Sequence, residues 1–242
     1  VLVGTYKIFP YDQLDSVKSI TLNEKTISKQ QNIIYENNVA ELINIKNSED
    51  ISKIKKNLID FIWKDLGFPY SKLPDNVNLN INNLAYSDFS NLKTIDELNI
   101  EMEYGVNSIS YLFTPELSNN KLIIYHQGHS GDFYNGKKTI QFFLDKNYSV
   151  LAFSMPLLGM NERPVVDIVN LGKIELTSHE HLRFLESNNF SPIKFFVEPI
   201  VVSLNYLDKN YNFSSYDMVG ISGGGWTVTL YSAIDDRISQ TY

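Results

Sequence analysis

The sequence contains no cysteine, no long apolar run and no basic stretch, and each absence removes a class of protein. Without cysteine, disulfide bonds, zinc sites built on thiolates and a cysteine nucleophile are all excluded. No run of 18 or more apolar residues occurs, so no transmembrane segment is predicted in the given chain. With a net charge of -7 and no stripe of Lys or Arg, the chain lacks the positive surface that a nucleic-acid partner requires.

What is present is a globular composition over 242 residues, of which 43% are hydrophobic and 13% aromatic. This length is sufficient for one domain with a buried core together with an extension. The composition changes near residue 95, because the residues before it are rich in Asn, Lys, Ile and Ser and poor in Gly. We therefore expect an N-terminal extension over residues 1–94 and a folded core over residues 95–242.

The expected extension has one clear element, an amphipathic helix over about residues 48–66. An Asn-Ser pair can cap its start, and the sequence GFP can end it. Five apolar residues recur at helical spacing, namely Ile51, Ile54, Leu58, Ile62 and Leu66.

The chain begins with VLVGTYKIFPYDQL, a short apolar segment followed by a mixed one. Such a start is typical of the stub beside a removed membrane anchor or signal segment. The compartment is left open, and one interpretation is the extracytoplasmic part of an anchored or exported protein. The alternative is an ordinary truncated first strand in a cytoplasmic protein.

The expected core begins with two strands and continues as an alternation of strands and helices. In residues 97–105 apolar and polar side chains alternate, as in a half-buried strand, and residues 108–115 follow after a turn. The apolar runs KLIIYHQG and YSVLAFSMP are typical of strands buried on both faces of a parallel sheet, and a helical segment separates them. The pattern predicts an α/β fold with a mainly parallel sheet entered through an antiparallel hairpin.

Gly220, Ser222 and Gly224 match the spacing Gly-x-Ser-x-Gly between an apolar strand and a helix. On so tight a turn the serine hydroxyl is pushed out above the sheet, and strand and helix come so close that only small residues fit beside them. The free N–H groups at the helix start, including that of Gly223, can stabilise a developing oxyanion. The motif predicts Ser222 as a catalytic nucleophile and Gly223 as an oxyanion donor, and a purely structural glycine turn is the alternative.

The same glycine-rich segment does not match either of two phosphate-binding motifs. A Walker-type loop requires a lysine where Trp226 stands, and the dinucleotide-binding pattern requires a third glycine where Val228 stands. No cofactor is therefore predicted.

A second constellation, LIIYHQGHSGDF, ends another apolar strand. A loop with glycines at this point can turn a backbone N–H toward a serine above the neighbouring strand. We expect the main chain of His129 to be the second oxyanion donor. Gly128 would support the loop, and the ring of His126 would order it through a hydrogen bond.

A metal site is the alternative use of these side chains. Its ligands would be His126, His129 and Asp132, with His179 and His181 from SHEHL. The cluster contains no thiolate and follows no tight zinc pattern, so no metal is predicted.

The segments KLIIYHQGHSGDF, YSVLAFSMPLLGMN and YDMVGISGGGWTVTLYSAIDDRI together resemble the α/β-hydrolase superfamily, in particular its esterase branch near the acetyl xylan esterases and dienelactone hydrolases. The resemblance covers about residues 95–242. It implies a serine hydrolase that cleaves a small-molecule ester or acylated substrate through an acyl-enzyme at Ser222. It also implies helix-rich insertions between PLLGMNERP and SHEHL on the substrate side of the pocket.

The triad partners of Ser222 are the missing part of this resemblance. In the superfamily the acid and the histidine follow the serine, whereas residues 223–242 contain no histidine, and Asp235 and Asp236 come too early to be the acid. An unassisted serine is a poor nucleophile at neutral pH. We expect a chain that lacks its C-terminal part, in which the acid and histidine would lie, and that is inactive alone. The alternatives are a non-catalytic binding module, or an unusual base such as His179.

Overall fold

The computed structural model describes residues 45–242, so the apolar start of the chain lies outside the described residues. Residues 47–242 form one compact unit. Residues 47–94, which we expected to form an extension, thus belong to the same unit as residues 95–242. Within the described residues, every helix is too short or too polar to cross a membrane.

A seven-stranded mixed sheet runs through this unit in the order β1-β2-β3-β5-β4-β8-β9. Its strands are β1 (Asn76–Asn78), β2 (Leu92–Glu101), β3 (Asn107–Pro115), β4 (Lys121–His126), β5 (Ser149–Phe153), β8 (Ser215–Gly220) and β9 (Ile238–Thr241). The neighbours β5, β4, β8 and β9 are parallel, whereas β1, β2 and β3 pair antiparallel, and β3 pairs antiparallel with β5. The predicted α/β class is confirmed, and the antiparallel pair β2 and β3 leads into the parallel strands.

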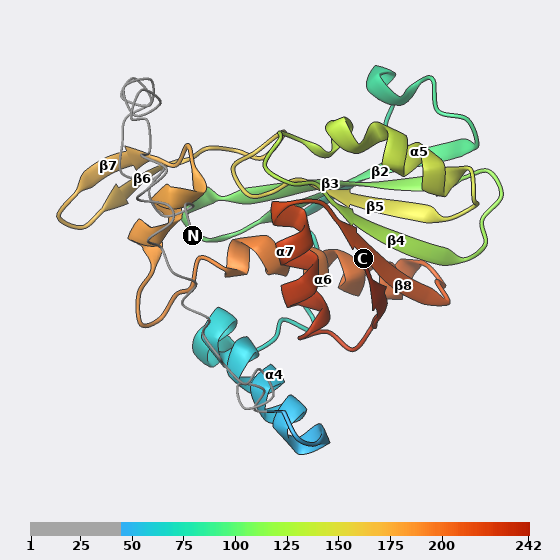
Figure 1. Ribbon diagram of the computed structural model, residues 1–242. Coiled ribbons are helices and arrows are strands. Elements are labelled where there is room, and N and C mark those ends of the chain that lie inside the picture. The colour runs from blue at the N-terminus through green and yellow to red at the C-terminus, as the bar shows by residue number, and fades with distance from the viewer. Residues whose placement is uncertain (1–44) are drawn as a thin grey trace, which may run out of the picture. The chain divides into compact units, whose positions relative to one another are not determined.

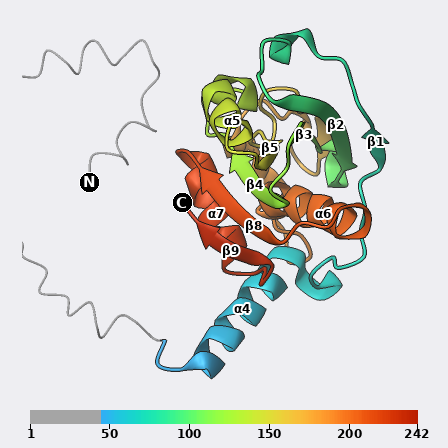
Figure 2. The same ribbon diagram turned by 90° about the vertical axis from the view of Figure 1, so that its right-hand side faces the viewer.

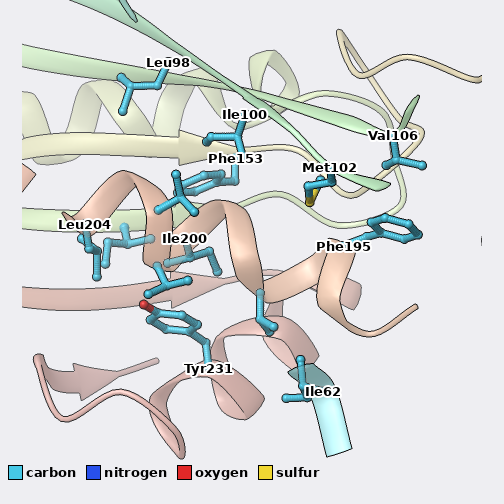
Figure 3. Packing of buried hydrophobic residues seen from close by; sticks show 14 of the residues in the cluster. Ile62, Leu98, Ile100, Met102, Val106, Phe153, Phe195, Ile200, Leu204 and Tyr231 are labelled. Atoms are coloured by element: carbon cyan, nitrogen blue, oxygen red, sulfur yellow. The ribbon is translucent and has the colours of Figure 1, made fainter. Parts of the chain in front are cut away.

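Helices cover both faces of the sheet (Figure 1). Helix α5 (Lys137–Leu144) connects β4 to β5 and lies on one face, whereas α6 (Lys194–Asn210) and α7 (Gly223–Ser232) lie on the other. The core on the second face contains Leu98 and Ile100 from β2, Ile200 and Leu204 from α6, and Tyr231 from α7 (Figure 3). This packing fixes α7, and hence the turn that precedes it, against the sheet.

The segment between β5 and α6 differs from the expectation. It contains the antiparallel strands β6 (Val165–Ile168) and β7 (Gly172–Glu175), followed by the 3-10 helix η6 (His179–Leu185). The expectation of helix-rich insertions is therefore wrong. The apolar residues of the segment between β5 and α6 come in short runs around a turn in which Asn170 and Gly172 have positive φ. This pattern fits a hairpin.

Helix α4 (Ser48–Trp63) continues as the 3-10 turn η2 (Lys64–Leu66) and projects from the sheet (Figure 2). Only its C-terminal end packs on the core: Ile62 is 1% exposed, whereas Ile51 is 54% exposed. Trp63 donates a hydrogen bond of 2.7 Å from Nε1 to the carboxylate of Glu198, which lies buried on α6. Burying a carboxylate costs free energy unless the charge is paired. Lys72 and Lys194 both form ion pairs with the carboxylate of Glu198.

The unequal packing of α4 predicts different effects for two identical substitutions. Ile62→Ala should lower the free energy of unfolding by about 2 to 4 kcal/mol, because it leaves a cavity in the core. Ile51→Ala, the matched control on the same helix, should change it by less than about 0.5 kcal/mol. Urea unfolding followed by circular dichroism measures both. Equal losses would contradict the packing described here.

Candidate functional site

Ser222 occupies the turn between β8 and α7 in a disfavoured backbone conformation, with φ 55° and ψ -120°. For a residue other than glycine such a conformation costs of order 1 to 3 kcal/mol and persists only where the surroundings enforce it. The turn is closed by hydrogen bonds from Gly224 N to Ile221 O (2.9 Å) and from Trp226 N to Ser222 O (3.3 Å). The Ser222 side chain is exposed, and its hydroxyl forms no hydrogen bond with any group in residues 45–242.

Three glycines allow the backbones around Ser222 to approach one another. A Cβ atom on Gly220 would lie 2.5 Å from the carbonyl oxygen of Gly224, and one on Gly224 would lie 2.1 Å from that of His126. A Cβ atom on Gly128 would lie 2.8 Å from the Cβ of Ser222. Strand β8, helix α7 and the loop after β4 thus meet where the sequence places glycine.

The end of β4 is joined directly to this turn, because Ile221 N donates to His126 O at 3.2 Å. The buried ring of His126 lies with Nδ1 2.9 Å from the carbonyl oxygen of Gln127. A carbonyl can only accept, so this nitrogen carries the proton. Burial lowers the pKa of His126 to about 4, and the ring is therefore neutral at pH 7. It orders the loop that leads to Gly128 and His129.

Two main-chain N–H groups near Ser222 are available to a ligand. Gly223 opens α7, where the N–H groups of the first turn have no helical partner and the helix dipole is positive. His129 follows Gly128, which contacts Ser222. Neither the Gly223 nor the His129 N–H donates a hydrogen bond to any described group. Both can therefore donate to a bound oxygen atom.

The side chain of His129 takes part in a second feature that sequence reasoning missed. Its Nε2 lies 3.0 Å from His179 Nδ1, and His179 Nε2 lies 2.7 Å from the carbonyl oxygen of Pro156. The His129 ring also lies against Gly223, since a Cβ atom there would be 2.6 Å from His129 Nδ1. Burial lowers the pKa of His179, and the hydrogen bond to Pro156 opposes this effect. The two histidines are 50 residues apart, so only the folded chain shows that they pair.

Aromatic rings continue from His179 to the first turn of α7. Ring centroids are 5.1 Å apart between His179 and Phe196, and 5.5 Å apart between Phe196 and the half-exposed Trp226. A cavity of about 210 Å³ is lined by His179 and Phe196 together with apolar residues that include Phe61, Leu182 and Ile193. The rings of His179, Phe196 and Trp226 thus form a continuous row, the aromatic wall, that ends on the first turn of α7.

A larger hollow, about 460 Å³, is lined by residues that include Lys55, Asp208, Asp235 and Arg237, and by none of the residues around Ser222. Arg237 forms ion pairs with Asp208 and Asp235 across it. Because these charges satisfy one another, Ser222 remains the candidate site.

The residues of the metal alternative make separate contacts. Asp132 accepts a hydrogen bond from Tyr134 N at 2.8 Å, and His181 Nδ1 lies 3.0 Å from Glu175 O. Within residues 45–242, no three side chains of His, Asp or Glu form a group that could hold a metal ion.

The glycine contacts predict a sharp difference between two adjacent positions. Gly224→Ala should lower the free energy of unfolding by about 1 to 3 kcal/mol, because its Cβ meets backbone that cannot move aside. At Gly225 a Cβ would have its nearest contact at 3.4 Å, so Gly225→Ala should be neutral or stabilise α7 by up to about 1 kcal/mol. Thermal unfolding of both variants tests this, and similar losses would count against the close approach.

The buried ring of His126 predicts a pH-dependent stability. The unfolded chain takes up the proton near pH 6.5 and the folded protein only near pH 4, so protonation favours unfolding. The free energy of unfolding should fall by about 3 kcal/mol as the pH decreases through this window. His126→Asn removes the titrating group. The difference in unfolding free energy between the protein and this variant should therefore shrink from pH 7 to pH 4, and a constant difference would refute the assignment.

No protein-family model and no curated protein matches the sequence. Solved structures do match in fold. Acetyl xylan esterase 1 from a Thermoanaerobacterium species has a TM-score of 0.55 and 14% identity, over 80% of this chain and 57% of that one. A putative acetyl xylan esterase from Bacteroides fragilis has a TM-score of 0.54 and 14% identity, over 80% and 53%. The acetyl xylan esterase from Paenibacillus sp. R4 has a TM-score of 0.51 and 16% identity, over 81% and 59%.

This chain therefore spans between 53% and 59% of the length of these three enzymes. At such low identity the likeness concerns the fold alone. The fold that the sequence resemblance implied is confirmed: the chain has the α/β-hydrolase fold, in common with acetyl xylan esterases.

Proposed function

We propose that this chain belongs to a serine hydrolase that cleaves carboxylic esters through an acyl-enzyme at Ser222. The observation that carries the proposal is the backbone of Ser222, held at φ 55° and ψ -120° on a turn that Gly220 and Gly224 close. A strained serine on a strand-to-helix turn, with its hydroxyl exposed, is the nucleophile elbow of α/β-hydrolases. Strain of this kind is stored where the chemistry needs it.

Each residue around the turn then has a role in the proposed reaction. The hydroxyl of Ser222 attacks the ester carbonyl carbon, and the carbonyl oxygen becomes negatively charged. The main-chain N–H groups of Gly223 and His129 form the oxyanion hole that stabilises this charge. Gly128 permits the close approach of the loop, and His126 orders it. The alcohol then leaves, and water releases the acid from Ser222.

Complete turnover needs an acid and a histidine, which in this fold follow the nucleophile. The chain spans little more than half of the compared enzymes, and residues 223–242 include no histidine. We propose that both residues belong to a C-terminal part beyond this sequence, and that this chain alone does not turn over substrate.

The proposed substrate is a small-molecule carboxylic ester or acylated compound. The three neighbours are named as acetyl xylan esterases, which supports a small acyl group. The aromatic wall at His179, Phe196 and Trp226 reaches the first turn of α7, which follows Ser222, and gives an apolar surface on which such a molecule can pack. The net charge of -7 argues against a nucleic-acid partner.

A non-catalytic binding module with the same fold is the second candidate. One observation favours it: in the described part of the chain, no histidine or carboxylate hydrogen-bonds the Ser222 hydroxyl. The binding module and the enzyme differ in whether Ser222 reacts.

Ser222→Ala tests the proposal in the protein extended through its C-terminal part. Loss of the nucleophile should lower ester cleavage by a factor of about 10⁴ or more and abolish the fluorophosphonate adduct, measured by intact mass. Ser232→Ala, at the far end of α7, should leave both unchanged. Cleavage that survives in the Ser222→Ala variant would refute the proposal. An extended protein that binds an ester but neither cleaves it nor forms an adduct would instead be the binding module.

A further inference from the structure

We propose that the cavity at the C-terminal end of α4 binds an apolar ring of the ester substrate, with Phe61 as a specificity-determining residue. The cavity, about 210 Å³ in volume, is lined by residues from α4, from η6 and from the segment that starts α6. The inference rests on the proposed function, because it requires an ester that reacts at Ser222. It goes further by naming the group that the chain selects: an uncharged ring of about the size of benzene.

The lining of this cavity favours an uncharged, apolar group. Most of its surface comes from apolar residues, namely Phe61, Leu182, Pro192, Ile193 and Phe196. Its two charged residues, Arg183 and Glu186, are exposed and opposite in sign, so they supply no net charge that would attract an ion. Burial lowers the pKa of His179, so this ring is also neutral at pH 7.

The volume of the cavity fits a ring better than an acetyl group. An apolar cavity of about 150 Å³ holds one benzene molecule. At about 210 Å³, this cavity can hold a phenyl ring together with part of its linker. Ser191 is also part of the lining, and its hydroxyl is buried without a hydrogen-bond partner in residues 45–242. An unpartnered buried hydroxyl costs free energy, and a bound molecule that carries an oxygen atom can offset that cost.

A path of direct contacts joins the cavity to the turn that carries Ser222. His179 lines the cavity, and its Nδ1 lies 3.0 Å from Nε2 of His129. A Cβ atom on Gly223 would lie 2.6 Å from Nδ1 of the same His129 ring. A single imidazole therefore separates the lining of the cavity from the residue that follows Ser222.

The aromatic wall gives a second path. Phe196 lines the cavity, and its ring centroid lies 5.5 Å from that of Trp226, on the first turn of α7. The wall thus borders the cavity at one end and the helix that follows Ser222 at the other. In the proposed complex the ester carbonyl lies at Ser222, a short alkyl linker follows the wall, and the ring occupies the cavity.

Phe61 is the lining residue best suited to a test, because its side chain is 46% exposed and its loss leaves no cavity in the core. The next two residues, Ile62 and Trp63, are buried and anchor the end of α4. Trp63 Nε1 donates to the carboxylate of Glu198 at 2.7 Å, which fixes where the helix ends and hence where Phe61 stands. The ammonium group of Lys64 lies 4.5 Å from the centroid of the Phe61 ring.

Phe142 provides a matched control. It is the same residue type and is 52% exposed, but it lies on α5, on the opposite face of the sheet from α6 and α7 (Figure 1). It is not among the residues that line the cavity. Phe142→Ala therefore removes a half-exposed phenyl ring without changing the proposed site.

The first test measures binding without any reaction. Fluorine NMR follows the titration of 4-(4-fluorophenyl)butan-1-ol with the chain of residues 1–242 and gives the Kd. Phe61→Ala should raise the Kd by about tenfold, because the bound ring loses one wall of its cavity. Phe61→Leu keeps an apolar wall and should stay within about threefold of the unchanged chain, and Phe142→Ala within about twofold. Thermal unfolding checks that each variant is folded.

The second test asks whether the cavity serves the substrate, in the protein extended through its C-terminal part. It compares kcat/KM within two pairs of esters that differ only by a phenyl ring: 4-phenylbutyl acetate with butyl acetate, and ethyl 5-phenylpentanoate with ethyl pentanoate. The unchanged protein should prefer the ester with the ring by about tenfold or more in at least one pair. Phe61→Ala should reduce this preference to about twofold or less, whereas Phe142→Ala should leave it as it is.

Two results would overturn the inference. An equal Kd for the unchanged chain and the Phe61→Ala variant would show that the ring does not bind in this cavity. A preference that is absent in both pairs, or that survives in the Phe61→Ala variant, would show that the cavity is not part of the substrate site. Cleavage that survives in the Ser222→Ala variant would instead refute the proposed function, and the alcohol titration, which needs no reaction, would still show whether the cavity binds a ring.

Discussion

The close approach of three backbone segments is the constraint on which the site depends. Strand β8, the start of α7 and the loop after β4 meet at Gly220, Gly224 and Gly128, where no larger side chain fits. This contact holds Ser222 in its strained conformation. The parallel pairing of β4 with β8 supplies the rigid support, because His126 and Gly220 are partners in the register. Loops at the carboxyl ends of parallel strands are where such folds bind their ligands.

Local patterns in the sequence predicted much of this, because they reflect contacts between near neighbours. The glycine spacing around Ser222 encodes a steric requirement within five residues, and the alternation over residues 97–105 encodes one face of a strand. The pairing of His129 with His179 was not predictable in the same way. It depends on how η6 folds back over the end of β5, and no residue near either histidine records that path.

What the sequence did not reveal depended on context outside the segment. The helix-rich insertion was inferred from a resemblance, whereas residues 165–175 follow their own turn chemistry and form a hairpin. In α4 the helical spacing was visible, but periodicity does not say which part of an apolar stripe is covered. Ile62 is buried because the adjacent Trp63 bonds the buried carboxylate of Glu198, while Ile51 lies beyond the reach of the core.

The backbone of Ser222 has an evolutionary consequence. At a positive φ, glycine is the residue that the main chain accepts most readily, so Ser222→Gly is the single change that relieves the most strain there. The same change deletes the hydroxyl. Selection for a more stable fold and selection for the proposed nucleophile would therefore act in opposite directions on one codon.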